Sequence, residues 1–199
     1  LTFVALPNAS VSVQWESLSI ANCSGPHAIG LVGLSFLTCR FLFSKGIYIQ
    51  DTSYVEIRGS HFLFSEAYSE DASFVVTNEA MKELSITDSA FVSALPPTKT
   101  ATLLWVARSV LRIEGNITFT NSFGRLGGAV RLTHSQVVTV GNAIVSFAGN
   151  RAQYGSGVYI EDVVCPLFNI SIGYPNFIFI NGSNTITGQT IIYIDGDLN

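Results

Sequence analysis

The chain has 199 residues, of which 48% are hydrophobic and 12% are charged, and its net charge is −4 at pH 7. This composition excludes a disordered chain, and the shortage of basic residues excludes a nucleic-acid-binding protein. Apolar runs such as 103–107 and 177–180 are far shorter than the roughly 20 residues of a membrane-spanning helix, so we expect no transmembrane helix.

Two short strand patterns recur in the same order along the chain. The first alternates apolar and polar residues, as in Val55 and Ile57 against Glu56 and Arg58, which predicts a strand with one buried and one wet face. Its copies begin at residues 18, 34, 55, 84, 111, 138 and 170. The second pattern follows each copy of the first and begins at residues 29, 47, 74, 103, 129, 158 and 191.

The spacing of these copies predicts the architecture. The intervals between copies are too short for a crossover helix but long enough for one turn of a coil. Because the pattern returns in the same direction each time, the strands should stack in parallel. No window has a helical pattern, and β-branched and aromatic residues are abundant. We therefore predict an all-β, right-handed parallel β-helix (a β-solenoid) of about seven coils, forming one domain over residues 1–199.

Phenylalanines lie between the two patterns in most copies. We predict that they stack along the core and do not form a ligand platform. The residues are Phe41, Phe43, Phe62, Phe64, Phe91, Phe119, Phe147, Phe177 and Phe179.

The three cysteines suggest one pairing. Cys23 and Cys39 have the same offset in consecutive copies of the first pattern, so stacking would place their Cα atoms about 5 Å apart, within disulfide range. A column of reduced, buried cysteines is an equally acceptable interpretation. Cys165 is expected to be a free thiol or a link to another copy.

Asn-x-Ser/Thr triplets occur five times, where the composition predicts about two by chance. We predict N-linked glycans and secretion, although a β-protein rich in Ser, Thr and Asn can also gather such triplets without modification. Alternation within 168–172 places Asn169 on the solvent side. The predicted glycosylation sites are Asn8, Asn22, Asn116, Asn169 and Asn181.

A catalytic set is the alternative to be weighed, because parallel β-helices often carry carboxylates of carbohydrate-active enzymes along a groove. The candidate column is Asp51, Asp162 and Asp195 with Glu161 beside it, but Asn78, Arg108 and His134 occupy the equivalent positions of other copies. Solvated turn residues that accept backbone hydrogen bonds are the favoured interpretation.

The other candidate groups are scattered. His27, His61 and His134 share no column, and no nucleophile elbow, metal-binding helix or phosphate-binding loop occurs. We expect no catalytic residue, no cofactor and no metal site.

The segments Gly127-Gly-Ala-Val-Arg-Leu132, Phe147-Ala-Gly-Asn150 and 155–160 resemble a known repeat class. They are similar to the GGA(I/L/V) and FxxN repeats of the chlamydial polymorphic outer membrane proteins, and related repeats occur in large secreted right-handed β-helix proteins of eukaryotes. The resemblance covers residues 115–165. It implies an adhesive or structural role at a cell surface or outside the cell, with no catalytic residue to carry over.

The ends of the chain complete the functional hypothesis. Leu1 is not an initiator Met, which suggests a processed product, an excised segment or a repeat of a longer protein. Neither end has an evident polar cap, so we expect adjoining solenoid segments or copies of the chain to stack end to end. The hypothesis is a non-catalytic extracellular or cell-surface structural glycoprotein, a subunit of a filament, sheath or adhesive surface. The alternative is a carbohydrate-active enzyme (polysaccharide lyase-like or glycoside hydrolase-like) or a carbohydrate-binding β-helix.

Overall fold

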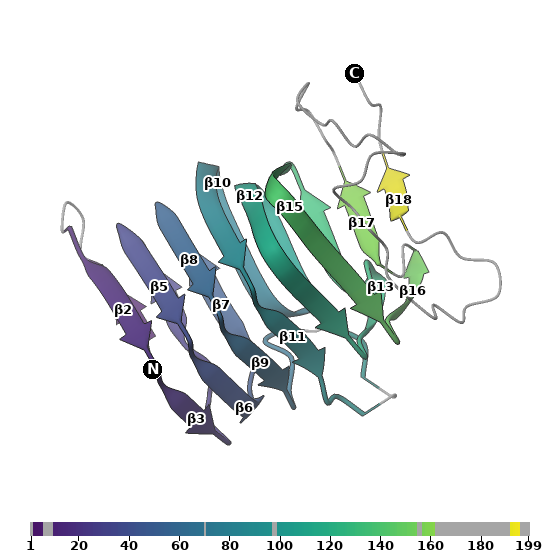
Figure 1. Cartoon of the computed structure of the whole chain (residues 1–199), viewed down its shortest axis with the longest axis horizontal. Helices are drawn as coiled ribbons and strands as arrows, with labels where there is room; N and C mark the ends of the chain where they lie inside the picture. The colour runs from purple at the N-terminus through teal and green to yellow at the C-terminus, as the bar shows by residue number, and fades with distance from the viewer. Residues whose placement is uncertain are drawn as a thin grey trace.

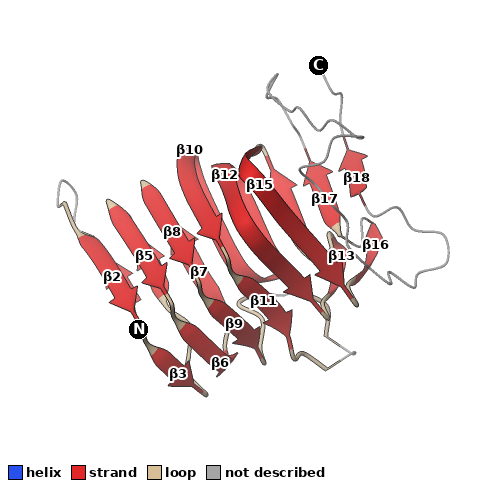
Figure 2. Cartoon of the chain, viewed as in Figure 1, coloured by secondary structure: helices blue, strands red, loops and turns tan. Residues whose placement is uncertain are grey.

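The computed structural model describes residues 2–5, 10–69, 71–96, 99–154, 157–161 and 192–195, and these contain strands and no helix. Parallel strands stack into a β-solenoid (Figures 1 and 2), which confirms the predicted fold class. The described residues complete about five turns, fewer than the predicted seven.

The strands of successive turns line up in three faces. Face 1 contains β1 (Thr2–Val4), β4 (His27–Ile29), β7 (Ile47–Gln50), the first part of β10 (Ala72–Thr87) and of β12 (Thr102–Thr120), β14 (Val130–Thr133), β17 (Val158–Glu161) and β18 (Ile192–Asp195). Face 2 contains β2 (Ser12–Glu16), β5 (Gly33–Leu37), β8 (Tyr54–Arg58), later parts of β10 and β12, and the first part of β15 (Gln136–Ala148).

Face 3 contains β3 (Ser19–Ala21), β6 (Arg40–Ser44), β9 (His61–Phe64), β11 (Ala90–Ser93) and the ends of β12 and β15. The separate strands β13 (Phe123–Leu126) and β16 (Arg151–Tyr154) pair with each other between faces 3 and 1. Figure 1 shows the strands of face 2 side by side, from β2 to β15.

The register corrects part of the first strand pattern. Its inward-facing column is Val13, Leu34, Val55, Leu84, Leu111 and Val137. The copies predicted to begin at 34, 55, 84 and 111 are therefore confirmed, whereas the copies placed at 18 and 138 are wrong. Residues 19–21 pair with 40–42 on face 3, so the segment 18–23 lies on a different face from 34–39 despite their similar sequences. The copy placed at 138 is off by one residue, because Leu111 pairs with Val137.

The second pattern shifts by one residue in places. Ile47 pairs with Phe74 as predicted, and Val158 lies in the same column as predicted, but the other members of the column are Leu104, Val130 and Ile192 instead of residues 103, 129 and 191. The first copy is also displaced, because Ile29 pairs with Gln50. Leu103 and Leu104 are both fully buried, so hydrophobicity alone does not identify the residue that faces the core.

A column of phenylalanines runs through the core behind face 3. The ring centroids of Phe41 and Phe62 are 5.2 Å apart, those of Phe62 and Phe91 5.2 Å, and those of Phe91 and Phe119 5.1 Å. Phe147 continues the stack. The prediction of stacked core aromatics is confirmed for these residues.

Phe43 is an exception, because 53% of it is exposed. Leu42 pairs with Leu63 and Ser44 with Phe64, so Phe43 is an extra residue without a partner in the next turn. Such a bulge breaks the alternation and turns a side chain outward. The prediction that Phe43 belongs to the core is therefore wrong, and Phe177 and Phe179 lie outside the described residues.

Small polar side chains occupy the inner corners between faces. At the corner between faces 2 and 3, Thr38 has a φ of 52° and Asp88 one of 46°, in the left-handed region. The residue that follows then points inward: Ser60 Oγ accepts a hydrogen bond from Cys39 N at 3.0 Å, and Ser89 Oγ accepts one from Ser60 N at 3.1 Å. Buried backbone groups at the corners thus find partners in the next turn.

Candidate functional site

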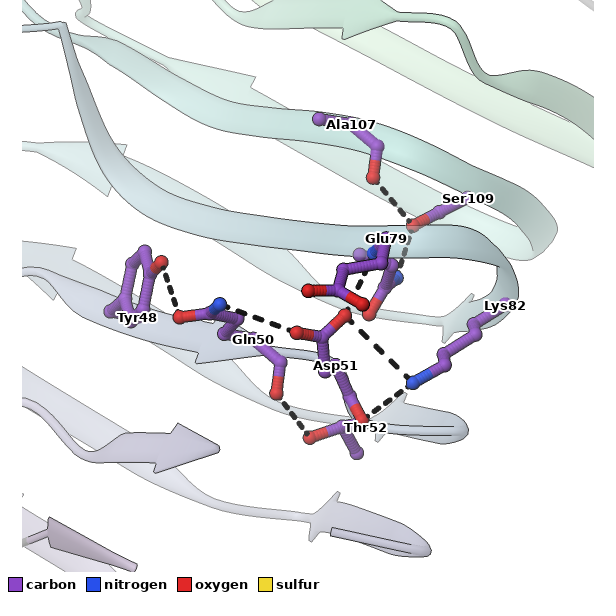
Figure 3. Close-up of polar contacts among 9 residues, drawn as sticks. Tyr48, Gln50, Asp51, Thr52, Glu79, Lys82, Ala107 and Ser109 are labelled. Atoms are coloured by element: carbon purple, nitrogen blue, oxygen red, sulfur yellow. Dashed lines mark hydrogen bonds and ion pairs between the residues drawn. The ribbon is translucent and has the colours of Figure 1, made fainter. Parts of the chain in front are cut away.

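The carboxylate of Asp51 lies at the corner between faces 1 and 2 (Figure 3), where it organises a longer connection in the next turn. This connection is residues 78–81, between Thr77 and Lys82. Their partners in the following turn, Ala107 and Ser109, are separated by a single residue. Asp51 Oδ1 accepts a hydrogen bond from Glu79 N at 2.7 Å. Lys82 Nζ donates to Asp51 O at 2.7 Å and lies 4.0 Å from Asp51 Oδ1.

Neighbouring side chains engage the other oxygen of this carboxylate. Gln50 Nε2 donates to Asp51 Oδ2 at 3.2 Å, and Tyr48 Oη donates to Gln50 Oε1 at 3.0 Å. Behind this row, Asn78 Nδ2 donates to the buried Ser109 Oγ at 2.7 Å. Both carboxylate oxygens of Asp51 therefore bind chain groups, which is the structural role expected of an Asp at a turn.

Asp51→Ala should lower the free energy of unfolding by about 1–2 kcal/mol, because the Glu79 amide and the Lys82 ammonium lose a partner at a partly exposed site. Hydrogen exchange should show the loss as faster exchange of the amides of 78–81. Asp71→Ala, in another connection, is the matched control and should leave those amides unchanged. An unaltered exchange rate of 78–81 in Asp51→Ala would contradict the assigned role.

Asp195, the other described carboxylate of the predicted column, does not line up with Asp51. Asp195 pairs with Glu161, in the column that contains Gln50 and Thr77, so it lies one position before the corner. Placing Asp195 with Asp51 was therefore wrong by one residue. Asp162 lies outside the described residues.

The non-acidic members of the corner column are confirmed. Asn78, Arg108 and His134 each directly follow a residue of the paired column Thr77, Ala107 and Thr133. Arg108 and His134 share the left-handed conformation of Asp51. Within the described residues, this corner brings together one carboxylate, one amide, one guanidinium and one imidazole, and no pair of carboxylates.

The histidines occupy different parts of the turn, as predicted. His27 points outward from face 1, with its ring centroid 4.9 Å from that of Tyr48. His61 lies on face 3, where its partial burial and, secondarily, the charge of Arg40 lower its pKa. The third, His134, lies at the corner described above. No shared proton-transfer site results from these positions.

The predicted pairing of Cys23 with Cys39 is wrong, since both are free thiols. The register that suggested it does not occur: Cys39 lies beside Leu18, whose carbonyl accepts from Arg40 N, and Cys23 lies beside Lys45. Cys39 is fully buried, its thiol donates to Trp15 O at 3.3 Å, and burial raises its pKa. These features indicate a packing residue, and Cys165 lies outside the described residues.

Two of the five predicted glycosylation sites lie in the described residues, and both are exposed. Asn22 follows β3 at the corner between faces 3 and 1, and Ser24 of its triplet is also exposed. Asn116 lies within β12, and Thr118 of its triplet points outward. Asn8, Asn169 and Asn181 lie outside the described residues.

The first rung of the solenoid, formed by β1, β2 and β3, has an open edge. Each of these strands pairs with one other strand among the described residues, on the side of the second rung. Their inward side chains continue the core columns and are only partly buried; they are Phe3, Val13, Trp15 and Ile20. Val4 and Leu18 are 60% and 38% exposed. Considering only the part of the chain that the structure describes, this end therefore presents unpaired backbone groups around an apolar centre.

Aromatic side chains on the outside of face 1 were not predicted from the sequence. Tyr68, in the connection after β9, stacks on Tyr48 with ring centroids 4.7 Å apart. Further along, the guanidinium of Arg131 lies 4.7 Å from the ring centroid of Trp105. The alignment of these residues depends on the register, which is why inspection of single strands did not reveal it.

Comparisons with known proteins supply no assignment: no family model, curated protein or solved structure matches the chain. Among the described residues there is no helix long and apolar enough to cross a membrane. The geometry of the solenoid is thus the basis for a functional proposal.

Proposed function

We propose that the chain is a non-catalytic structural module of an extracellular glycoprotein, which extends by end-to-end stacking of solenoid rungs. The partner is an adjoining solenoid segment or a second copy of the chain. The single observation that carries the proposal is the open first rung.

The chemistry of this edge matches another rung of the same kind. Unpaired strand edges are templates for further pairing, and natural proteins usually blunt them with Pro, Lys or a covering segment. Strand β2 contains neither Pro nor Lys in Ser12–Glu16. Three open strands arranged around a partly buried Trp15 fit a partner that also presents three parallel strands around an apolar core.

The chemistry along the sides of the solenoid also supports a structural role. Asp51, the described carboxylate at the corner, is used to hold a connection, and the described glycosylation triplets are exposed, so sugars there would leave the core undisturbed.

Gln14→Pro should abolish end-to-end association while leaving the solenoid folded. Ser17 N donates to Leu37 O of the second rung, and alternation along a parallel strand then directs the amide of Gln14 toward the open edge. Proline removes this edge donor without removing a hydrogen bond to the second rung. Sedimentation velocity of the purified chain should show concentration-dependent oligomers for the wild type and monomers for Gln14→Pro.

Gln14→Ala is the matched control and should still associate. Circular dichroism should show the same β-content for all three proteins. Two results would refute stacking of copies through this edge: a wild type that stays monomeric at every concentration, with no filaments in electron micrographs, or oligomers that persist in Gln14→Pro.

A further inference from the structure

Asn22 and Phe43 occupy equivalent positions in the first and second turns. Ala21 pairs with Leu42, and Asn22 N donates to Leu42 O at 2.9 Å, so the two residues lie next to each other at the same corner. Their φ angles are 52° and 51°. Side chains at equivalent positions of adjacent parallel strands are about 4.8 Å apart and point in the same direction.

Phe43 is an unusual residue for this position. A bulky side chain is rarely found in the left-handed region, and here the aromatic ring is also largely exposed. Because Phe43 has no partner in the third turn, Asn22 is its neighbour in the corner column. Strain and exposure together indicate a function for the ring outside the protein core.

Asn22 is a glycosylation acceptor by its chemistry. It is exposed and followed two residues later by the exposed Ser24. In the transfer reaction, Asn22 Nδ2 forms a bond to C1 of the sugar of a lipid-diphosphate oligosaccharide. The bond from C1 to the phosphate oxygen breaks, the amide loses a proton, and the lipid diphosphate leaves.

We propose that Phe43 is a stacking platform for the first sugar of an N-linked glycan on Asn22. The C–H bonds on one face of a pyranose carry partial positive charge and pack on the electron-rich face of an aromatic ring. The ring one rung away from the acceptor is within reach of that sugar. The inference rests on the proposed function, because it requires passage through a glycosylating pathway.

Asn116 provides an internal contrast. Its backbone N donates to Asp88 Oδ1 at 2.8 Å, and its strand partner in the next turn is Ile144, so the paired position holds an aliphatic side chain and not an aromatic ring. A glycan at Asn116 should therefore make no comparable contact.

The test is a double-mutant cycle on the chain secreted from a eukaryotic host. Ser24→Ala removes the glycan while keeping Asn22 in its left-handed conformation, and Phe43→Leu removes the ring while keeping an apolar side chain. Glycopeptide mass spectrometry should show Asn22 occupied in the wild type and in Phe43→Leu. Ser24→Ala should lower the melting temperature by about 2–4 °C in the wild type and by less than 1 °C in the Phe43→Leu background.

Two controls make the outcome specific. Phe43→Tyr keeps an aromatic ring and should restore the full effect of Ser24→Ala. Thr118→Val removes the Asn116 triplet with a residue of similar shape, and its effect should be the same with and without the Phe43 ring.

The results separate this inference from the proposed function. Occupancy at other triplets but not at Asn22, or an equal effect of Ser24→Ala in both backgrounds, overturns the platform and leaves the glycoprotein proposal standing. Absence of glycan at every triplet overturns both.

Discussion

Phe62→Ala is expected to lower the free energy of unfolding by about 3–5 kcal/mol, the range for deleting a buried aromatic ring. Phe62 is fully buried and stacks on Phe41 and Phe91, each with centroids 5.2 Å away. It also meets Phe36 and Phe74 edge to face at 5.8 and 5.5 Å. The cavity would interrupt a column shared by several turns. Urea denaturation followed by circular dichroism measures the loss.

Phe43→Ala, in protein from a bacterial host without N-glycans, is the control for this experiment. Its ring is exposed, so its removal should change stability by no more than about 0.5 kcal/mol. Phe62→Leu should fall between the two variants, because leucine refills part of the cavity. A loss below about 1 kcal/mol in Phe62→Ala would contradict a tightly packed phenylalanine column.

The alternation of residues was sufficient to predict the fold class. Val55 and Ile57 are fully buried, whereas Glu56 and Arg58 point outward, as the pattern indicates. Parallel pairing followed from the repeated direction of such segments, and the pairing of β5 with β8 confirms it. Strand periodicity is a local property, so it can be obtained without knowledge of the partner strand.

Register could not be predicted with the same success, because it depends on partners far apart in the chain. The segments 18–23 and 34–39 are similar in sequence, yet 19–21 pair with 40–42. The erroneous Cys23–Cys39 pairing followed from that similarity. The bulge at Phe43 has no sequence signal of its own either. After the extra residue of a bulge, simple alternation assigns each following side chain of the strand to the wrong face.

For the candidate sites too, local features could be predicted from the sequence, whereas contacts between turns could not. Triplets such as Asn22-Cys23-Ser24 are visible in the sequence, but the ring beside the acceptor is 21 residues away and becomes a neighbour only through the register. Asp51 was correctly predicted to be a turn residue that accepts backbone hydrogen bonds. Its actual partner, the amide of Glu79, belongs to the next turn and was not foreseen.

Asn150→Leu is expected to destabilise the solenoid by about 2–4 kcal/mol, because one buried backbone amide loses its partner and a second buried hydrogen bond is lost. Asn150 is fully buried at the corner after face 3. Its Oδ1 accepts from Ser122 N at 3.1 Å, and its Nδ2 donates to Phe119 O at 2.8 Å. Leucine has a similar volume but neither group, so the Ser122 amide is left without a partner and the Phe119 carbonyl loses one of its donors. Urea denaturation gives the total loss, and faster hydrogen exchange at Ser122 locates it.

Asn121→Gly is the matched control at the same corner. Asn121 is exposed and has a φ of 60°, which glycine adopts readily, so this variant should differ from the wild type by less than about 1 kcal/mol. The contrast also gives a physical reason for the Phe147-x-x-Asn150 spacing: Phe147 joins the ring stack, and three residues later the buried amide ties its turn to the one before. An Asn150→Leu protein as stable as Asn121→Gly would show that this amide is not needed to join the turns.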